Sequence, residues 1–315
     1  MRKVKLFTHT DLDGVGCAIV AFRVFGRENV DVEYCENTEI HDAVRRFLYR
    51  EEYELYDQIF ITDMSVSPEL AEMIDKLHRF DKITIYLFDH HSTALWLDEY
   101  SWATVTTHLE DCKTSGTELL YDHFESLLEY SGLWSFVELV RSYDTWDWYA
   151  EDDMDAKRLN DLYYLIGRNR FVDRFTENSD ALNLSESENM LLDIESERIH
   201  RYIGSKVRDC QYIHIDNYFV VVVFADQYLS ELGNELTKLN PDCHFVAMIT
   251  GKNISYRTNR DDVHVGEFAQ LHNGGGHAKA AGSPLTKQIQ KKLVSIPFKP
   301  VWWKALWNLC KRVGS

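Results

Sequence analysis

The stretch VKLFTHTDLDGVGCAIVAF, residues 4–22, joins an apolar run to a periodic run through a short polar segment. The run at 4–8 predicts a buried strand, and apolar residues at helical spacing predict a helix over Gly14–Phe25. Three polar residues stand at alternate positions between the two runs: His9, Asp11 and Asp13. Carboxylates placed this close repel each other unless a cation lies between them. The strand end therefore raises the hypothesis of a metal site.

Strand-like and helix-like runs continue to alternate through the first half of the chain. Strands are predicted at 32–35, 58–63 and 83–89, and helices at 40–49 and from Pro68 onward, with Ser67 as N-cap. The main strands are apolar throughout, which is typical of a parallel sheet that helices cover on both faces. We therefore predict an α/β fold that begins with such a sheet.

Two further polar clusters follow predicted strands. Asp63 ends the strand at 58–63, and Asp89, His90 and His91 end the strand at 83–89. Binding sites in open parallel sheets form at the carboxyl ends of the strands, so we expect these clusters to meet His9 and its neighbours there. A further carboxylate is available in the helical stretch RSYDTWDW, as Asp144 or as its rival Asp147.

The predicted ligand set consists of imidazoles and carboxylates and contains no thiolate. This donor set suits Mn²⁺ or Mg²⁺ better than structural zinc, and the number of groups is sufficient for two ions. Each residue also has a structural interpretation. Asp13 could cap the following helix, Asp63 could be a turn residue, and Asp144 could be a surface charge. The recurrence of such clusters at matching places favours the metal site.

The second half of the chain predicts a different organisation. A long helix is expected at 186–207, followed by a smaller α/β unit with strands at 211–215, 218–224, 243–249 and 253–257 and a helix at 229–239. The predicted domains are a metal-binding domain at 1–150, a helical linker at 151–208, a substrate-binding domain at 209–290 and a tryptophan-rich helical tail at 291–315, with its helix at 301–313.

Composition excludes several classes of protein. With 315 residues, 45% of them hydrophobic, the chain has enough apolar side chains for a sizeable core. The formal charge of −17 argues against a partner such as a long duplex nucleic acid. The six cysteines form no CxxC pair, and we expect them to be reduced, as in a cytoplasmic protein. We see neither a signal peptide nor a membrane helix.

Taken together, these motifs resemble the DHH phosphoesterase family, whose name describes the triplet Asp89-His90-His91. The segments HTDLDG at 9–14, Asp63 and Asp144 resemble further motifs of that family, and GGGHAKAAG at 274–282 resembles the loop of its DHHA1 domain. Within the family, HTDLDGVGC and YDTWDW most resemble the NrnB-type oligoribonucleases, or nanoRNases. The resemblance implies an N-terminal DHH domain and a smaller C-terminal α/β DHHA1 domain.

The resemblance also implies a function. It implies a cytoplasmic, Mn²⁺-dependent phosphodiesterase that hydrolyses very short RNA oligonucleotides, down to dinucleotides, to 5′-mononucleotides through two-metal activation of water. An action on cyclic dinucleotides or on nucleoside 3′,5′-bisphosphates is the alternative within the family. A nucleotide sensor without catalysis is the alternative of a different class. A homodimer through the tail also stays open.

The family pattern assigns a role to each residue of the metal site. One ion would be held by His9, Asp11 and Asp63. The other would be held by Asp13, Asp63, His90 and Asp144, so that Asp63 bridges the two. Asp89 would orient a ligand histidine, and His91 would lie near the substrate phosphate.

The substrate phosphate would be bound by the second domain. A triple-glycine loop allows backbone N–H groups to approach a phosphate closely, and an arginine can bind its oxygens through two nitrogens. The expected contacts come from Gly274, Gly275, Gly276, His277 and Arg257. An ordinary flexible loop is the alternative for the glycines. An ion pair with Asp261 or Asp262 is the alternative for Arg257, and Arg260 is its rival.

Overall fold

The computed structural model describes residues 3–80, 82–128, 132–151 and 153–296 of the chain. The chain divides into two compact units, Met1–Asp193 (unit 1) and Ile194–Ser315 (unit 2). The division falls within the long helix α10 (Glu186–Arg208). This helix confirms the one predicted at 186–207. The finer predicted domain boundaries stay predictions, and the helix predicted at 301–313 lies outside the described residues. Among the described residues, no helix has the length and apolar character needed to cross a membrane.

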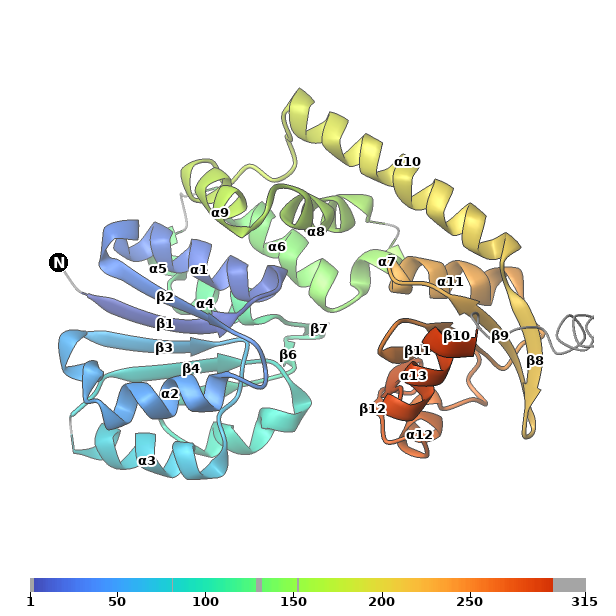
Figure 1. Ribbon diagram of the computed structural model, residues 1–315. Coiled ribbons are helices and arrows are strands. Elements are labelled where there is room, and N and C mark those ends of the chain that lie inside the picture. The colour runs from blue at the N-terminus through green and yellow to red at the C-terminus, as the bar shows by residue number, and fades with distance from the viewer. Residues whose placement is uncertain (1–2, 81, 129–131, 152, 297–315) are drawn as a thin grey trace, which may run out of the picture. The chain divides into compact units, whose positions relative to one another are not determined.

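Unit 1 is built on a sheet of five parallel strands in the order β2-β1-β3-β4-β5 (Figure 1). Its strands are β1 (Val4–His9), β2 (Val30–Cys35), β3 (Gln58–Thr62), β4 (Ile85–Asp89) and β5 (Ala103–Val105), and a separate hairpin contains β6 (His108–Leu109) and β7 (Cys112–Lys113). Strand β2 lies on one side of β1 in the sheet, and β3, the next strand in the chain, lies on the other side of β1. The order therefore reverses between β1 and β3, where ligand sites of such sheets form.

Helices cover both faces of this sheet, as the apolar strands predict. The helices are α1 (Leu12–Phe25), α2 (Ile40–Tyr49), α3 (Pro68–Arg79), α4 (Gly116–His123), α5 (Glu125–Leu128), α6 (Trp134–Asp144), α7 (Asp147–Glu151), α8 (Met154–Ile166) and α9 (Arg168–Glu177). Three 3₁₀ helices lie at Arg27–Asn29, Glu52–Leu55 and Ser92–Glu99. Successive side chains of a strand point to opposite faces. Leu6 therefore belongs to a core cluster with residues of α1, α4, α6, α8 and α9, and its neighbour Phe7 belongs to a cluster with residues of α2 and α3. Figure 1 shows α1 and α9 on one side of the sheet and α2 and α3 on the other.

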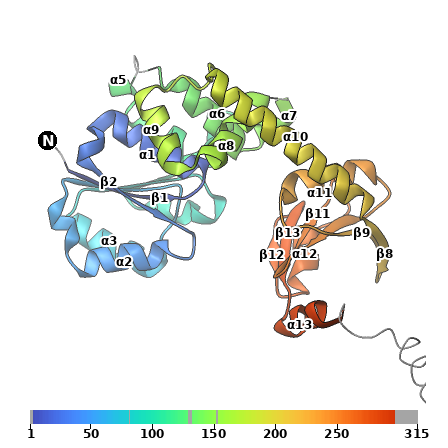
Figure 2. The same cartoon turned by 45° about the horizontal axis from the view of Figure 1, so that its top comes forward.

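Unit 2 contains a mixed sheet in the order β12-β13-β11-β10-β9-β8, in which only the β9–β10 pair is parallel. Its elements are β8 (Gln211–Ile215), β9 (Tyr218–Phe224), α11 (Leu229–Leu239), β10 (Phe245–Ile249), β11 (Asn253–Arg257), α12 (Val265–Gln270), β12 (Gly275–Gly276), β13 (Ala280–Pro284) and α13 (Lys287–Ser295). Leu232 of α11 packs on one face of the sheet with Val221 and Val246, and Phe268 of α12 packs on the other face with Phe245 (Figure 2). This confirms a smaller α/β unit after the long helix.

Candidate metal centre

The end of β1 and the start of α1 bring His9 and Asp11 together. The Oδ1 atom of Asp11 accepts a hydrogen bond from the backbone N–H of Gly14 across 3.1 Å, so Asp11, and not Asp13, is the N-cap of α1. Its other oxygen, Oδ2, lies 2.7 Å from His9 Nδ1. A Cβ on Gly14 would lie 2.3 Å from the backbone oxygen of His9. A glycine at position 14 is therefore required for the close approach of helix and strand end.

Asp13 lies in the first turn of α1 and is buried against the start of a second helix. Its Oδ2 accepts a hydrogen bond from Gly116 N at 2.6 Å, and its Oδ1 accepts one from Thr117 N at 2.8 Å. Both donors are free backbone N–H groups at the beginning of α4, where the helix dipole also favours a negative charge. The carboxylate is thereby fixed in position and stabilised as an anion.

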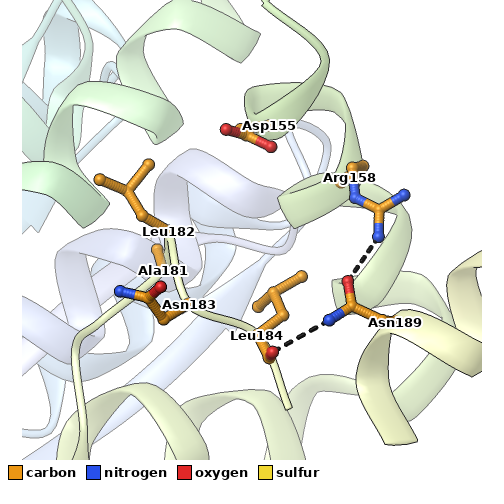
Figure 3. A pocket seen from close by; sticks show the side chains of 7 residues that line it. All are labelled: Asp155, Arg158, Ala181, Leu182, Asn183, Leu184 and Asn189. Atoms are coloured by element: carbon orange, nitrogen blue, oxygen red, sulfur yellow. Dashed lines mark hydrogen bonds between the residues drawn. The ribbon is translucent and has the colours of Figure 1, made fainter. Parts of the chain in front are cut away.

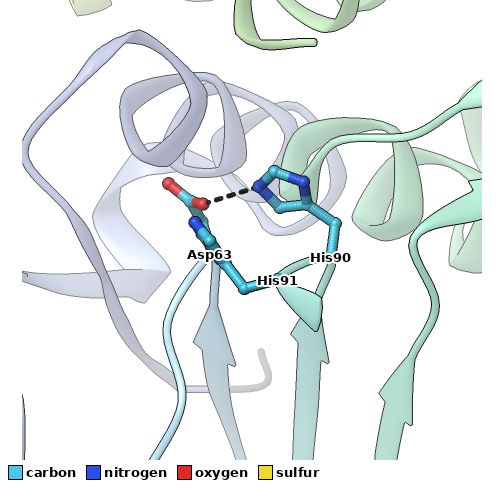
Figure 4. A group of neighbouring side chains, drawn as sticks. All are labelled: Asp63, His90 and His91. Carbon is cyan, nitrogen blue, oxygen red and sulfur yellow. Dashed lines mark ion pairs between the residues drawn. The ribbon is translucent and has the colours of Figure 1, made fainter. Parts of the chain in front are cut away.

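Asp63 follows β3 and occupies the centre of the cluster. Its backbone has a φ of 57°, in the left-handed region that an aspartate tolerates better than most residues. Its N–H donates to the carbonyl of Phe88 at 2.8 Å, which links the ends of β3 and β4. Its Oδ2 lies 3.8 Å from His9 Nδ1 and its Oδ1 lies 3.3 Å from His90 Nε2 (Figure 4). The two oxygens of one carboxylate therefore face two histidines from different strands.

His90 follows β4 and faces three carboxylates through one nitrogen. Besides Asp63, its Nε2 lies 3.4 Å from Asp144 Oδ2 and 3.7 Å from Asp13 Oδ2. Asp144 ends α6. The rival residue Asp147 instead forms an ion pair with Arg141 at 3.1 Å. The structure thus brings Asp144 to the cluster and gives Asp147 a cationic partner.

The remaining two residues of the triplet pair with each other. Asp89 is buried at the end of β4, and its Oδ1 lies 2.7 Å from His91 Nδ1 and accepts a hydrogen bond from the His91 N–H at 3.2 Å. This contact orients the ring of His91, whose side chain is 54% exposed, and makes Nδ1 the nitrogen that faces the carboxylate. The histidine that Asp89 orients in this structure is therefore His91, whereas His90 faces Asp63.

The electrostatics of the cluster are unfavourable without a cation. Among the described residues, no lysine or arginine forms an ion pair with the five clustered carboxylates, which are Asp11, Asp13, Asp63, Asp89 and Asp144. Burial, and then repulsion by Asp13, raise the pKa of Asp63 and of Asp144 well above the usual range. Burial also acts to raise the pKa of Asp11, but the hydrogen bonds and charge of His9 and the hydrogen bond from Gly14 lower it overall.

The donor atoms fit divalent metal ions. Three groups have ligand atoms within 4.8 Å of one another: His9, Asp11 and Asp63; Asp13, His90 and Asp144; and Asp63, His90 and His91. The Oδ2 atom of Asp63 and the Nε2 atom of His90 are buried without a hydrogen bond to any described residue. A buried oxygen and a buried nitrogen without such partners destabilise a fold unless another group binds them. Oxygen and imidazole donors around shared carboxylates are typical of Mn²⁺ or Mg²⁺ sites.

Comparison with known proteins agrees with this geometry. The N-terminal domain of the DHH family matches residues 3–141. The chain is 37% identical over 323 residues to the oligoribonuclease NrnB of Bacillus subtilis (strain 168), across 98% of this chain and 80% of that relative.

The chain belongs to the DHH family. It is therefore an enzyme of the DHH phosphoesterases, as the motifs predict. It is also 25% identical to a 3′,5′-cyclic-nucleotide phosphodiesterase of Helicobacter pylori (strain ATCC 700392 / 26695), across 90% of this chain and 93% of the relative. The solved structure of the pGpG-specific phosphodiesterase PggH from Vibrio cholerae shares the fold, with a TM-score of 0.57 at 14% identity, across 93% of this chain and 97% of that one.

In this DHH protein, the sequence patterns missed one residue beside the candidate metal ligands. Gly116 begins α4 behind the cluster, and a Cβ there would lie 2.8 Å from Asp63 Cβ and 3.0 Å from Asp13 Oδ2. Only a glycine lets α4 approach both carboxylates this closely. The signal in the sequence is weak. Gly116 follows Thr114 and Ser115, which read as an ordinary helix start, and nothing in the spacing relates them to Asp13.

The predicted glycine loop of unit 2 is part of the sheet and is not a flexible loop. Gly275 and Gly276 form β12 and pair with β13. A Cβ on Gly274 would lie 2.0 Å from Gly282 O, and Gly276 has a φ of +135°, so both positions require glycine for the fold itself. A Cβ on Gly275 would meet nothing within 4 Å. His277, which follows, is exposed.

Arg257 ends β11 and has no carboxylate partner among the described residues. Its Nη1 donates to the carbonyl of Tyr256 at 2.9 Å and its Nη2 donates to Ser230 Oγ at 3.4 Å. Burial lowers its pKa from the usual value. Its rival Arg260 instead uses Nε and Nη2 in a two-bond contact with Asp262, at 2.9 and 2.7 Å. Asp262 and Asp261, the alternative partners of Arg257, therefore pair with Arg260 and Lys279 instead.

A separate pocket of unit 1 shares no residue with the metal centre. It has a volume of about 240 Å³ and is lined by Asp155, Arg158, Ala181, Leu182, Asn183, Leu184 and Asn189 (Figure 3). The guanidinium of Arg158 donates to Asn189 Oδ1 at 2.6 Å, and Asn189 Nδ2 donates to Leu184 O at 3.0 Å. Arg158 and Asn189 are thus already bonded to each other, and we assign this pocket no role.

Proposed function

We propose that this DHH enzyme is a metal-dependent phosphodiesterase that hydrolyses very short RNA, down to dinucleotides, to 5′-mononucleotides in the cytoplasm. The observation that carries the proposal is the position of Asp63. Its two oxygens face His9 and His90, so one carboxylate belongs to two groups of ligands. The 37% identity to an oligoribonuclease over nearly the whole chain supports the choice of substrate. A homodimer stays a prediction.

Two divalent ions, most suitably Mn²⁺, would be held by the groups on either side of Asp63. The ligands of one ion would be His9, Asp11 and Asp63, and those of the other would be Asp13, Asp63, His90 and Asp144. Bound there, such ions supply Lewis acidity that activates water and neutralises charge on phosphate oxygens. The chain itself contributes the orientation. Asp13 is fixed by two backbone donors of α4, and Asp11 is fixed by the start of α1.

His91 would contact the substrate phosphate. Asp89 binds its Nδ1, which leaves Nε2 as the nitrogen for a ligand. The side chain of His91 is half exposed, whereas that of Asp89 is buried. His91 can therefore reach a substrate while Asp89 holds its Nδ1 inside the protein. Asp89 is thus a positioning residue that acts through His91.

A second phosphate contact would come from unit 2. Arg257 carries a charge without a carboxylate partner, and Gly275 leaves open space above its backbone. The register places Arg257 opposite Ala280 and Gly276 opposite Ala281, so the two lie about 10 Å apart across two strand spacings. Because a Cβ on Gly275 would meet nothing within 4 Å, Gly275→Ala tests phosphate binding without a steric conflict inside the protein.

Hydrolysis of a cyclic nucleotide is the second candidate function. The relative from Helicobacter pylori, with 25% identity over 90% of this chain, is named for that reaction. Both reactions cleave a phosphodiester, and the same ligand groups would serve both. Substrate competition, rather than the metal site, distinguishes them.

A cleavage time course with Mn²⁺ tests the proposal. The substrates are a 5′-phosphorylated RNA dinucleotide, a 24-nucleotide RNA and a 3′,5′-cyclic nucleotide. Asp63→Ala and His90→Ala are the inactive variants, and Asp42→Ala, whose side chain is 77% exposed, is the matched control. We expect the dinucleotide to disappear fastest, the control to match the wild type and both ligand variants to lose activity.

Other outcomes redirect the proposal in defined ways. Faster cleavage of the long RNA contradicts the preference for short substrates. Faster cleavage of the cyclic compound favours the second candidate. Tight nucleotide binding without cleavage by the wild type contradicts both and indicates a sensor.

A further inference from the structure

The turn that follows Asp144 carries a large aromatic side chain that is exposed to solvent. Trp146 is 58% exposed, two residues after the carboxylate that lies 3.4 Å from His90 Nε2. A single exposed aromatic side chain needs no explanation by itself. The position of this one, two residues after Asp144, keeps its backbone within about 7 Å of a proposed ligand residue.

The backbone of this turn is held in an uncommon conformation. Trp146 has a φ of 64°, in the left-handed region where a bulky side chain is a genuine outlier. The turn is kept there by neighbouring contacts: Trp146 N–H donates to Tyr143 O at 3.3 Å, and Lys113 Nζ donates to Thr145 O at 3.1 Å. Strain of this kind is concentrated at functional sites and is maintained by surrounding structure. Burial of the side chain does not account for the conformation, because Trp146 is 58% exposed.

Other aromatic rings support Trp146 from within the protein. Its ring centroid lies 5.8 Å from that of Trp148, with 31° between the planes. Trp148 is half-buried and stacks on Tyr143 at 5.9 Å with an interplanar angle of 13°. The result is a packed aromatic surface in which Trp146 is the most exposed ring. We refer to Tyr143, Trp146 and Trp148 as the aromatic platform.

We propose that the aromatic platform is a nucleobase-binding site, in which a base of the substrate stacks on Trp146. The proposal rests on the proposed function, and it adds the substrate group that this part of the protein recognises. A flat base stacks on an indole whatever its identity, since every base has a π-face. A phosphate bound at the metal centre carries its nucleoside within a short distance, and Trp146 is the exposed ring that follows a metal ligand.

The proposal explains how a short substrate can be bound without sequence readout. A dinucleotide offers few phosphates for charge contacts, so its bases must contribute to binding. A single stacking surface tolerates all four bases, which suits an enzyme that degrades RNA fragments of any sequence.

The test combines substrates that lack one base with enzyme variants that lack the Trp146 ring, as in a double-mutant cycle. The substrates are the RNA dinucleotide pApA and two analogues in which one or the other base is replaced by hydrogen. The variants are Trp146→Ala, Trp146→Gly and Trp146→Phe. Glycine tolerates a positive φ, so Trp146→Gly removes the ring while easing the backbone. The control is Trp134→Ala, because Trp134 is 45% exposed at the start of α6 and packs on Tyr121.

We expect Trp146→Ala and Trp146→Gly to raise KM for pApA by about 5- to 100-fold, with little change in kcat. Trp146→Phe restores most of the affinity, and Trp134→Ala behaves as the wild type. For the analogue that lacks the stacked base, we expect the wild type to have a KM as high as that of the Trp146 variants for pApA. The Trp146 substitutions should not raise the KM for that analogue further. Binding of pApA also quenches tryptophan fluorescence in the wild type and less in Trp146→Phe.

Three results would overturn the proposal. An unchanged KM for pApA in both ring-deletion variants removes the stacking role while the hydrolysis itself stands. An equal loss on pApA and on both analogues shows that Trp146 acts on structure and not on a base. If the wild type leaves pApA intact, the proposed function fails first and the base site fails with it.

Discussion

Asp13 and Gly116 are 103 positions apart in sequence, yet Asp13 Oδ2 accepts a 2.6 Å hydrogen bond from Gly116 N. The bond joins the first turn of α1 to the first turn of α4, and it fixes one carboxylate of the metal centre. Any residue except proline could supply this backbone N–H, and glycine is required because a side chain would conflict with both carboxylates. The geometry of the centre therefore depends on a residue that has no ligand atom.

Replacement of this glycine should damage the centre without removing a ligand. In Gly116→Ala the new Cβ would lie 2.8 Å from Asp63 Cβ and 3.0 Å from Asp13 Oδ2, so α4 or both carboxylates must shift. We expect a loss of activity of about 100-fold, since a displacement near 1 Å costs about that much. The overpacking should also destabilise the protein by about 1–3 kcal/mol. Steady-state kinetics and urea unfolding measure the two effects.

Gly204→Ala is the matched control for that variant. Gly204 lies inside α10, and a Cβ there would meet nothing within 4 Å. We expect full activity and a gain in stability of about 0.5–1 kcal/mol, because alanine is the better helix former. Equal activity in the two variants would contradict the role assigned to Gly116.

The choice between Asp144 and Asp147 can be measured directly. Asp144→Asn removes a charge that faces His90, whereas Asp147→Asn removes a partner of Arg141. Calorimetric titration with Mn²⁺ should show two bound ions in the wild type and in Asp147→Asn, and weaker or single-ion binding in Asp144→Asn. We expect the activity of Asp144→Asn to fall by more than the roughly 10- to 100-fold typical of residues behind a ligand. Loss of an ion in Asp147→Asn would reverse the assignment.

The sequence was sufficient for the sheet of unit 1 and for the list of clustered side chains. Apolar strands alternating with helices predict the parallel sheet, and parallel strands end at one edge. Residues as distant as His9 and His90 could therefore be placed together without coordinates. The structure agrees, since both lie within 4 Å of Asp63.

Details that depend on packing between helices could not be predicted. The sequence offered Asp13 as a possible cap of the helix that follows HTDLDG, whereas the geometry shows that Asp11 caps α1. The partner of Asp89 and the role of Gly116 depend on how β4 and α4 approach the cluster. The bond between Asp13 and Gly116 spans 103 positions, whereas the contacts of Asp11 and Asp89 are local but depend on side-chain orientation, so none of them leaves a periodic pattern.

Metal binding should stabilise the protein through the same carboxylates. If Mn²⁺ binds the proposed ligand groups of the folded protein and not the unfolded chain, a free Mn²⁺ concentration of 100 times the dissociation constant adds about 2.7 kcal/mol to the free energy of unfolding. For a unit of this size we expect Tm to rise by roughly 5–10 °C over a sample in chelator. Asp63→Asn should lose this response and still be no less stable than the wild type in chelator, because one carboxylate has left a repulsive cluster. Differential scanning calorimetry with and without Mn²⁺ decides the point, and a full metal response in Asp63→Asn would argue against a bridging ligand.

Arg257 and Arg260 provide a matched pair for the phosphate contact in unit 2. The guanidinium of Arg260 already donates two hydrogen bonds to Asp262. Arg257 has no carboxylate partner among the residues that the structure describes. Arg257→Ala should raise KM for a dinucleotide by about 10- to 100-fold, as expected for the loss of a hydrogen bond to a charged group, with kcat less affected. Arg260→Ala should change KM by no more than about twofold, because an exposed ion pair contributes little.

Two further variants separate phosphate binding from folding. The side chain of Arg257 packs so closely on α11 that a Cβ on Gly233 would lie 2.6 Å from Arg257 Cγ. Gly233→Ala should therefore displace the guanidinium and raise KM while the charge remains. Arg257→Lys should recover only part of the affinity, because an ammonium cannot bind two oxygens in a fork. If Arg260→Ala proved the more damaging change, the phosphate contact would belong to the other arginine, and Asp262 would have to release it when substrate binds.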